Sequence, residues 1–155
     1  MKLSEIMTRE VEIVQPDDPL EFAAKKMRDR DIGFLPVCDG ATLIGVISDR
    51  DITVRALAEG MDGSVMLSRD LMTTPAIFCF EDQDVSEAAE IMAKNQVRRL
   101  VILSRDNEQV VGVISLGDLG RNGTADLSRK VLKHVSAPAA SPDASHKASE
   151  PQQDT

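Results

Sequence analysis

The chain carries one pattern twice, and this internal duplication limits its possible folds more than any other feature. Residues 44–52 read IGVISDRDI and residues 111–119 read VGVISLGDL, so both follow apolar-Gly-apolar-apolar-Ser-x-x-Asp-apolar. Val and Ile are branched at Cβ and favour strands. A serine followed three residues later by an acid is typical of a helix start. Each stretch therefore predicts a buried strand, a turn and the beginning of a helix.

The residues ahead of the two motifs repeat as well. At a spacing of 65, Met7, Leu20, Ala23, Ala24, Met27 and Leu35 match Met72, Val85, Ala88, Ala89, Met92 and Leu100. The motif glycines match at 112 − 45 = 67, so the second hairpin turn is predicted to be 67 − 65 = 2 residues longer. A unit of about 60 residues has little core of its own. We therefore expect the two units to pack face to face.

Each unit predicts the order strand, helix, strand, strand, helix, which makes the fold class α/β (α+β). The predicted strands are 11–14, 32–38 and 42–48 in the first unit, and 76–80, 97–103 and 109–115 in the second. Asp18 with Glu21, and Asp84 with Glu87, have the spacing of helix caps.

The repeats divide the chain into residues 1–66 and 67–135, the second unit including an additional helix over about 124–135. Gly120 to Gly123 is expected to interrupt the helix that follows the second motif. Residues 136–155 are rich in Ala, Pro, Ser, Asp and Gln, a composition that predicts a disordered tail.

Composition excludes several function classes. The net charge is −8 and aromatic residues make up only 3%, so neither general nucleic-acid binding nor membrane binding is expected. Cys38 and Cys79 are far apart and outside any CxxC or Cys/His cluster, which favours reduced thiols in a cytoplasmic protein over a metal site or a disulfide. No apolar run approaches the length of a membrane span. We find no pattern of catalytic residues and expect no enzymatic activity.

The repeated serine and aspartate have two interpretations. Both side chains can accept hydrogen bonds from free amides at a helix start and so act as caps. Alternatively, the carboxylate can hold the hydroxyls of a sugar, while the hydroxyl and nearby amides hold a phosphate. The motif alone leaves both interpretations open.

The twin motifs, the Met-Thr openings at residues 7–8 and 72–73 and the stretch Phe34–Val37 resemble a CBS-domain pair, also called a Bateman module. The resemblance covers residues 1 to about 119. It implies a regulatory module that binds adenosine-containing ligands between the two repeats. AMP, ADP and ATP are the commonest, and S-adenosylmethionine, NAD and diadenosine compounds are less common. It also implies a homodimer, and any regulated target would be another protein. The alternative is a structural or interaction module without a nucleotide.

The resemblance also assigns roles to residues of this chain. In the family the motif aspartate holds the ribose and the serine contacts ribose or phosphate. That implies one site with Ser48 and Asp51 and a second with Ser115 and Asp118. The base would be flanked near Ile13, Val14, Ile77 and Phe78.

A phosphate on this acidic chain needs a local cation. Arg98 and Arg99 lie where the family often carries basic phosphate ligands. Adjacent strand residues face opposite sides, and Arg99 is favoured over Arg98 for the cleft. The first unit has Gly33 and Phe34 at these positions, so its cation candidates are Arg50 and Arg55. Either the second cleft binds a phosphorylated nucleoside through Arg99, or both units share the phosphate site.

Overall fold

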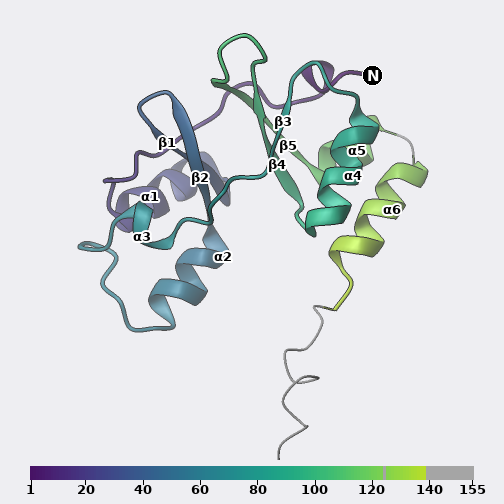
Figure 1. Ribbon diagram of the computed structural model, residues 1–155. Helices are drawn as coiled ribbons and strands as arrows, with labels where there is room; N and C mark the ends of the chain where they lie inside the picture. Colours follow the sequence, from purple (N-terminus) through teal and green to yellow (C-terminus); the bar gives the residue numbers. More distant parts are fainter. Residues whose placement is uncertain (124, 139–155) are drawn as a thin grey trace, which may run out of the picture.

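The computed structural model describes residues 1–123 and 125–138, which form two units that each combine a small sheet with helices (Figure 1). This confirms the predicted α/β (α+β) class and the two repeated units. From residue 139 onward, the predicted disordered tail lies outside the described residues. The same holds for Thr124, at the predicted start of the last helix.

The first unit is built on a hairpin. Helix α1 (Leu20–Arg30) precedes strands β1 (Phe34–Asp39) and β2 (Thr42–Ser48), which pair antiparallel. After β2 come the short helix α2 (Asp49–Asp51) and a π-helical segment, η2 (Ile52–Leu57). The core between hairpin and helices consists of Val14, Leu20, Ala23, Met27, Leu35, Val37, Ile47, Ala56 and Leu71.

The predicted first strand over residues 11–14 is wrong: only Val14 bridges to Val37. Val14 N–H donates to Pro36 O (3.0 Å), and Cys38 N–H donates to Val14 O (2.9 Å). The next bond of such a parallel ladder would require an N–H on Pro36, which proline lacks. The equivalent residue of the second unit is Val101, and there strand β3 (Phe78–Phe80) pairs with its neighbour over three residues.

The second unit has a three-stranded sheet in the order β3, β4 (Arg99–Leu103), β5 (Val110–Ser115). Its helices are α4 (Val85–Asn95), α5 (Leu116–Asn122) and α6 (Ala125–Val135). Helix α5 continues through Gly120, so the predicted interruption begins only at Gly123. The hairpin turn holds six residues between the paired Leu103 and Val110, against four between Cys38 and Leu43, which confirms the two-residue insertion.

The two predicted helix caps have different outcomes. Asp84 caps α4 as expected: its carboxylate accepts from Ser86 N–H (2.9 Å), and its own N–H donates to Glu87 (2.8 Å). Asp18 does not cap α1, whose N-cap is Pro19. The Asp18 carboxylate instead accepts from Gln15 N–H (2.7 Å), in the turn before the helix.

Each repeat gives its opening segment to the core of the other repeat. Segment η1 (Leu3–Glu5) and Met7 belong to the second unit, where Leu3 and Met7 are buried. Helix α3 (Ser68–Leu71) packs on the first unit, where Leu71 is buried. Thr8 then bridges to Val113 of β5, and Thr73 bridges to Val46 of β2. The two units are therefore joined through reciprocal contacts of their openings.

The motif glycines make room for these exchanged segments. A Cβ atom on Gly112 would lie 2.5 Å from the Met7 Sδ and 3.1 Å from Thr8 O. On Gly45, it would lie 2.8 Å from the Met72 Sδ and 2.9 Å from Thr73 O. The glycine in each motif is thus explained by the close approach of another part of the backbone.

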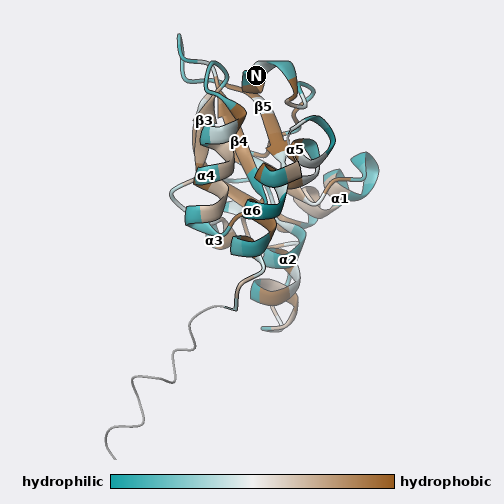
Figure 2. Cartoon of the chain, turned by 90° about the vertical axis from the view of Figure 1, so that its right-hand side faces the viewer, coloured by the Kyte–Doolittle hydropathy of each residue, from teal (hydrophilic) through white to brown (hydrophobic). Residues whose placement is uncertain are grey.

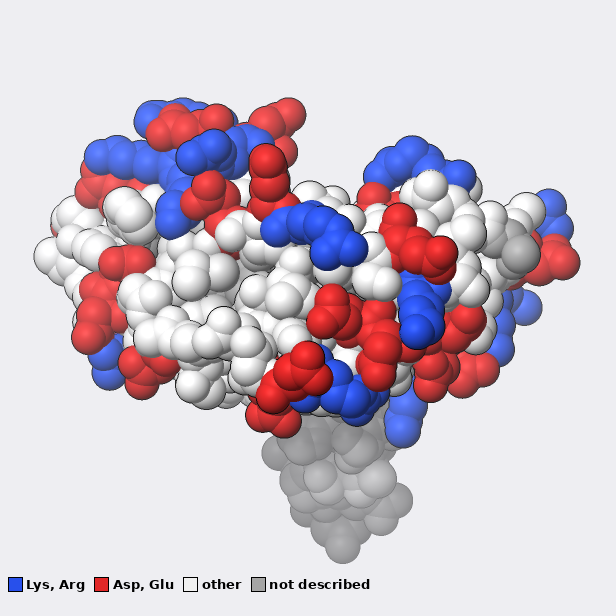
Figure 3. Space-filling model, turned by 90° about the horizontal axis from the view of Figure 1, so that it is seen from above, with Lys and Arg blue, Asp and Glu red and all other residues white. Residues whose placement is uncertain are grey.

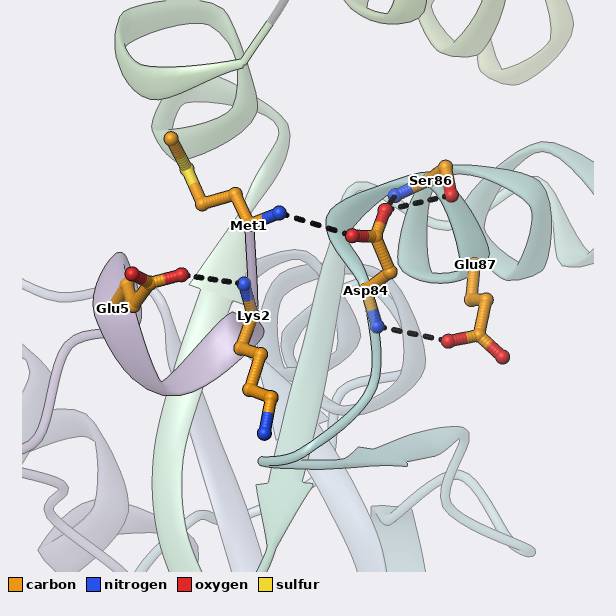
Figure 4. Close-up of polar contacts among 6 residues, drawn as sticks. All are labelled: Met1, Lys2, Glu5, Asp84, Ser86 and Glu87. Atoms are coloured by element: carbon orange, nitrogen blue, oxygen red, sulfur yellow. Dashed lines mark hydrogen bonds and ion pairs between the residues drawn. The ribbon is translucent and has the colours of Figure 1, made fainter.

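The beginning of the chain is held to the start of α4 (Figure 4). The Met1 amine lies 3.0 Å from the Asp84 Oδ2, and Leu3 N–H donates to Gln83 O (2.9 Å). Hydrogen bonds from the backbone and hydroxyl of Ser86, together with the Met1 amine, lower the pKa of Asp84 to about 2. The carboxylate that caps α4 therefore also anchors the exchanged segment.

Helix α6 covers the helical side of the second unit only. It packs on α4 and α5, beside which Figure 2 shows it, and Val131 is fully buried there. On the corresponding helices of the first unit, Phe22, Val54 and Leu57 remain exposed, Leu57 to 72%. The two repeats therefore differ in the apolar surface that they present.

Candidate functional site

The serine and aspartate of each motif cap the helix that follows. In the second motif, Ser115 Oγ accepts from Asp118 N–H (3.1 Å), and Asp118 Oδ2 accepts from Ser115 N–H (2.8 Å). In the first motif, Ser48 Oγ accepts from Asp51 N–H (3.1 Å), and Asp51 Oδ2 accepts from Ser48 N–H (2.9 Å). The capping interpretation is confirmed for both copies. The two aspartates differ in their surroundings.

The second motif lies on the wall of a cavity of about 420 Å³ that both repeats form. The first repeat contributes residues from two segments, 8–12 and 31–34. The second contributes Arg99 from the start of β4 and residues of β5 and α5. Its apolar walls are Val11, Ile32, Phe34 and Val113, and its polar side chains are Thr8, Glu10, Glu12, Asp31, Arg99, Ser115, Asp118 and Arg121.

The Asp118 carboxylate is held in a fixed position at the wall of this cavity. Its side chain is only 13% exposed, Oδ2 accepts from the Ser115 hydroxyl (2.9 Å), and Oδ1 accepts from Arg121 Nη2 (2.5 Å). A carboxylate has about four lone-pair sites. With three of its bonds made inside the protein, Asp118 retains acceptor capacity toward the cavity. Sequence reasoning missed Arg121, although its position three residues after Asp118 on one helix was a usable signal.

The corresponding aspartate of the first motif has a different neighbour. Arg55 Nη1 donates to Leu71 O (3.2 Å) and to Thr73 Oγ1 (3.4 Å), while its Nε lies 3.7 Å from Asp51 Oδ1. The guanidinium thus connects Asp51 to the exchanged opening of the second repeat. Arg50, the other candidate cation, is exposed, and its backbone N–H donates to Asp49 Oδ1 (2.8 Å).

The residues expected to flank a base are not brought to the cavity of Asp118. Val14 is 1% exposed and belongs to the first core, and Ile77 packs against the second core. Ile13 O accepts from Lys26 Nζ (2.6 Å). Phe78 lines another cavity, of about 310 Å³, between the two hairpin turns. Val11, three residues before Val14, provides the apolar wall instead.

The two adjacent arginines lie differently. Arg99 lines the cavity of Asp118, as preferred from the sequence. Arg98 and Arg99 together line a neighbouring groove of about 790 Å³, which also contains Arg129 of α6. Gly33 and Phe34, at the matching positions of the first repeat, face the same cavity as Arg99.

The other ionisable and reactive groups of the described residues are scattered over the structure. In the view of Figure 3, acidic and basic side chains are interspersed. Cys38 and Cys79 are buried free thiols, and burial raises both pKa values, with Glu87 adding to the effect on Cys79, whose pKa is about 11. Within residues 1–123 and 125–138, no group of three or more His, Cys, Asp or Glu is arranged to hold a metal. In the same part of the chain, every helix is too short or too polar to cross a membrane.

Comparison with known proteins identifies the architecture. A sequence model of the CBS domain matches residues 3–57 and 68–121, more than half of the chain. The CBS domain-containing protein YhcV of Bacillus subtilis is 34% identical over 120 residues, covering 77% of this chain and 84% of that protein.

Two crystal structures show the same fold. Hypoxic Response Protein I, with two coordinated zinc ions, is 31% identical with a TM-score of 0.71, covering 79% of this chain and 98% of that one. The CBS domain pair of MJ0100, in complex with 5′-methylthioadenosine and S-adenosyl-L-methionine, is 25% identical with a TM-score of 0.70, covering 78% and 94%. This chain therefore belongs to the CBS-domain family, as a tandem pair of CBS repeats of the regulatory type.

Proposed function

We propose that the protein is a non-enzymatic sensor that binds an adenosine-containing ligand, AMP, ADP or ATP, in the cavity of Asp118. The observation that carries the proposal is the position of this carboxylate. It lies at the wall of a cavity of about 420 Å³, opposite apolar side chains of the other repeat. A nucleoside needs both features, because its base is flat and apolar on its faces and its ribose presents two hydroxyl donors.

The cavity offers a suitable environment for each part of such a ligand. Val11, Ile32 and Phe34 form an apolar wall for the base. Asp118 accepts from a ribose hydroxyl, in a bond strengthened by the carboxylate charge. Arg99 lines the same cavity and provides a cation for a phosphate, while the Ser115 hydroxyl donates to Asp118 and helps to hold that carboxylate in place. Ser48 and Asp51 remain candidates for a second, weaker site.

A relative supports the class of ligand. The MJ0100 CBS pair is a complex with two adenosyl compounds, and it shares 25% of its sequence with this chain. Because Glu10, Glu12 and Asp31 also line the cavity, a ligand with a positive sulfonium, such as S-adenosylmethionine, is the alternative that the local charge favours. NAD, or a purely structural module without a ligand, are the further alternatives that the experiment below separates.

Binding would act on the contact between the repeats. The cavity walls come from residues 8–12, which follow the exchanged opening, from residues 31–34 after α1, and from the second motif. A ligand that touches all three would hold them together and reduce the motion of one repeat against the other. We propose that a cytoplasmic target protein, not yet identified, responds to this change.

We also propose that the protein is a homodimer that pairs through the first repeat. The groove between α1 and η2 is lined mainly by apolar residues, and Leu57 at its edge is 72% exposed. The corresponding helices of the second repeat are covered by the amphipathic helix α6, which supports the proposal that the exposed face of the first repeat is also covered. A second copy, presenting the same face about a two-fold axis, would cover both grooves at once.

Thermal unfolding with AMP, ADP, ATP, NAD, S-adenosylmethionine and GTP tests the ligand. A compound at about a hundred times its Kd adds about 2.7 kcal/mol to stability. Asp118→Ala is expected to weaken the ligand that binds by roughly tenfold to a hundredfold, since it removes charge-assisted bonds.

Asp84→Ala is the control, because it removes a helix-capping carboxylate that belongs to neither motif and does not line the cavity. Wild-type affinity in Asp118→Ala would refute the assignment of the site. Well-folded protein that responds to none of the compounds would favour the structural module.

A further inference from the structure

A basic groove continues from the cavity of Asp118. It has a volume of about 790 Å³ and lies between the end of β5, the start of β4 and helices α5 and α6. Arg99 and Ser115 line both the cavity and the groove, so the two spaces meet at these residues.

The two spaces differ in charge. The cavity is lined by the carboxylates of Glu10, Glu12, Asp31 and Asp118 and by two arginines, and Glu12 is also paired with Lys26 (3.3 Å) and Arg30 (3.2 Å). The groove is lined by Arg98, Arg99 and Arg129, and none of its lining residues in the described chain is acidic. The whole protein has a net charge of −8, so the charge of this groove is opposite in sign to that of the protein. The groove therefore attracts phosphates more strongly than the cavity does.

We propose that the groove holds the distal phosphates of a nucleoside polyphosphate, so that the protein prefers a triphosphate to a monophosphate. This inference rests on the proposed nucleoside site at Asp118. The first phosphate lies at the junction, near Arg99 and Ser115. The following phosphates lie between Arg98 and Arg129, whose planar guanidinium groups can each bind two phosphate oxygens.

Arg129 is available for this role, on a helix that is held in place. Its ion pair with Asp126 is long, at 3.7 Å, and the two side chains are 80% and 95% exposed, so the pair contributes little and is easily given up. The helix that carries Arg129 is fixed by the buried Val131 in its packing on the second core. The position of Arg129 therefore depends on α6, outside the part of the chain that resembles the two repeats.

The test compares adenosine, AMP and ATP by titration calorimetry on the full chain and on Arg129→Gln. Wild-type protein should bind ATP at least about tenfold more tightly than AMP, since each additional charge contact contributes to affinity. Arg129→Gln should weaken ATP about fivefold and leave AMP and adenosine unchanged. Lys130→Gln is the control: it removes the same charge from α6 at a residue that does not line the groove.

The outcomes separate this inference from the proposed function. If adenosine and AMP bind but ATP binds no more tightly, or if Arg129→Gln weakens AMP as much as ATP, the inference is wrong and the nucleoside site stands. An equal loss of ATP affinity in Lys130→Gln would also overturn it, because the effect would then be one of net charge. If none of the three compounds binds, the nucleoside site itself fails. Inorganic tripolyphosphate then tests the groove alone, and binding unaffected by Arg129→Gln refutes the groove.

Discussion

The exchange of opening segments between the two repeats is tested most directly by adding a methyl group to Gly112, the glycine of the second motif. In Gly112→Ala the new Cβ would lie 2.5 Å from the Met7 Sδ, 2.9 Å from the Met7 Cγ and 3.1 Å from Thr8 O. Two of these three atoms belong to a side chain that is itself only 7% exposed and cannot move into solvent without leaving the core. We therefore expect Gly112→Ala to destabilise the protein by about 1–3 kcal/mol, the usual cost of overpacking a core.

A double-mutant cycle identifies the origin of this cost. Met7→Ala alone should cost about 2–5 kcal/mol, because it leaves a cavity in the second core. It also removes both side-chain atoms that the new methyl would meet, leaving only Thr8 O at 3.1 Å. In the Met7→Ala background the Gly112→Ala methyl should therefore be nearly neutral, which corresponds to a coupling of about 1–3 kcal/mol.

Urea unfolding of the four proteins measures the cycle, and Gly120→Ala is the control. A Cβ on Gly120 has as its nearest neighbour Ser128 Oγ at 3.9 Å, so an alanine in this helix should stabilise by about 0.5–1 kcal/mol. If Gly112→Ala and Met7→Ala are additive within about 0.5 kcal/mol, the methyl does not meet Met7. The exchange of openings would then be refuted at this position.

Three further predictions concern other parts of the molecule. Because the pKa of Asp84 is lowered to about 2 from its ordinary 3.8, its contribution to stability is complete above the ordinary value and is lost as the pH falls toward 2. Urea unfolding of Asp84→Ala should accordingly depend less on pH between 4 and 2, and an unchanged dependence would contradict the role of the cap. With its pKa raised to about 11, Cys79 should react with iodoacetamide at pH 8 far more slowly in native protein than in urea, and equal rates would show that it is not buried. Sedimentation analysis should find Leu57→Asp monomeric and Leu132→Asp, changed on α6, still dimeric, whereas a dimer in both would exclude pairing through the first repeat.

Much of the fold could be predicted because the duplication doubles every local signal. The hairpins and the cap at Asp84 follow from patterns within a few residues, and the longer second turn follows from comparing the spacings of the two repeats. The missing strand before α1 does not, because its cause is Pro36, the residue opposite it in the sheet. A proline is visible in the sequence, but the bond that it prevents becomes apparent only when the pairing partner is known.

Sequence reasoning named several residues of the candidate site, two of them in the second motif. Ser115, Asp118 and Arg99 do lie around one cavity, while their predicted roles toward a ligand stay proposals. The other walls, residues 8–12 and 31–34, come from the first repeat, and no periodicity within one repeat indicates which segments of the other will lie opposite. The expectation for Val14 failed for a related reason: the same bridge that joins it to Val37 turns its side chain into the core.

The exchange of opening segments has a consequence for the stability of a single repeat. A fragment of residues 1–66 would keep the slot beside Gly45 that Met72 normally fills, and would also carry Met7, the counterpart of Met72. Two such fragments have the means to complete each other, each inserting its own opening into its neighbour. An ancestor with one repeat could have been stable as a self-complementing pair of chains. Fusion of two gene copies would then have converted an association that depends on concentration into one that depends only on a linker, and left each half free to change separately.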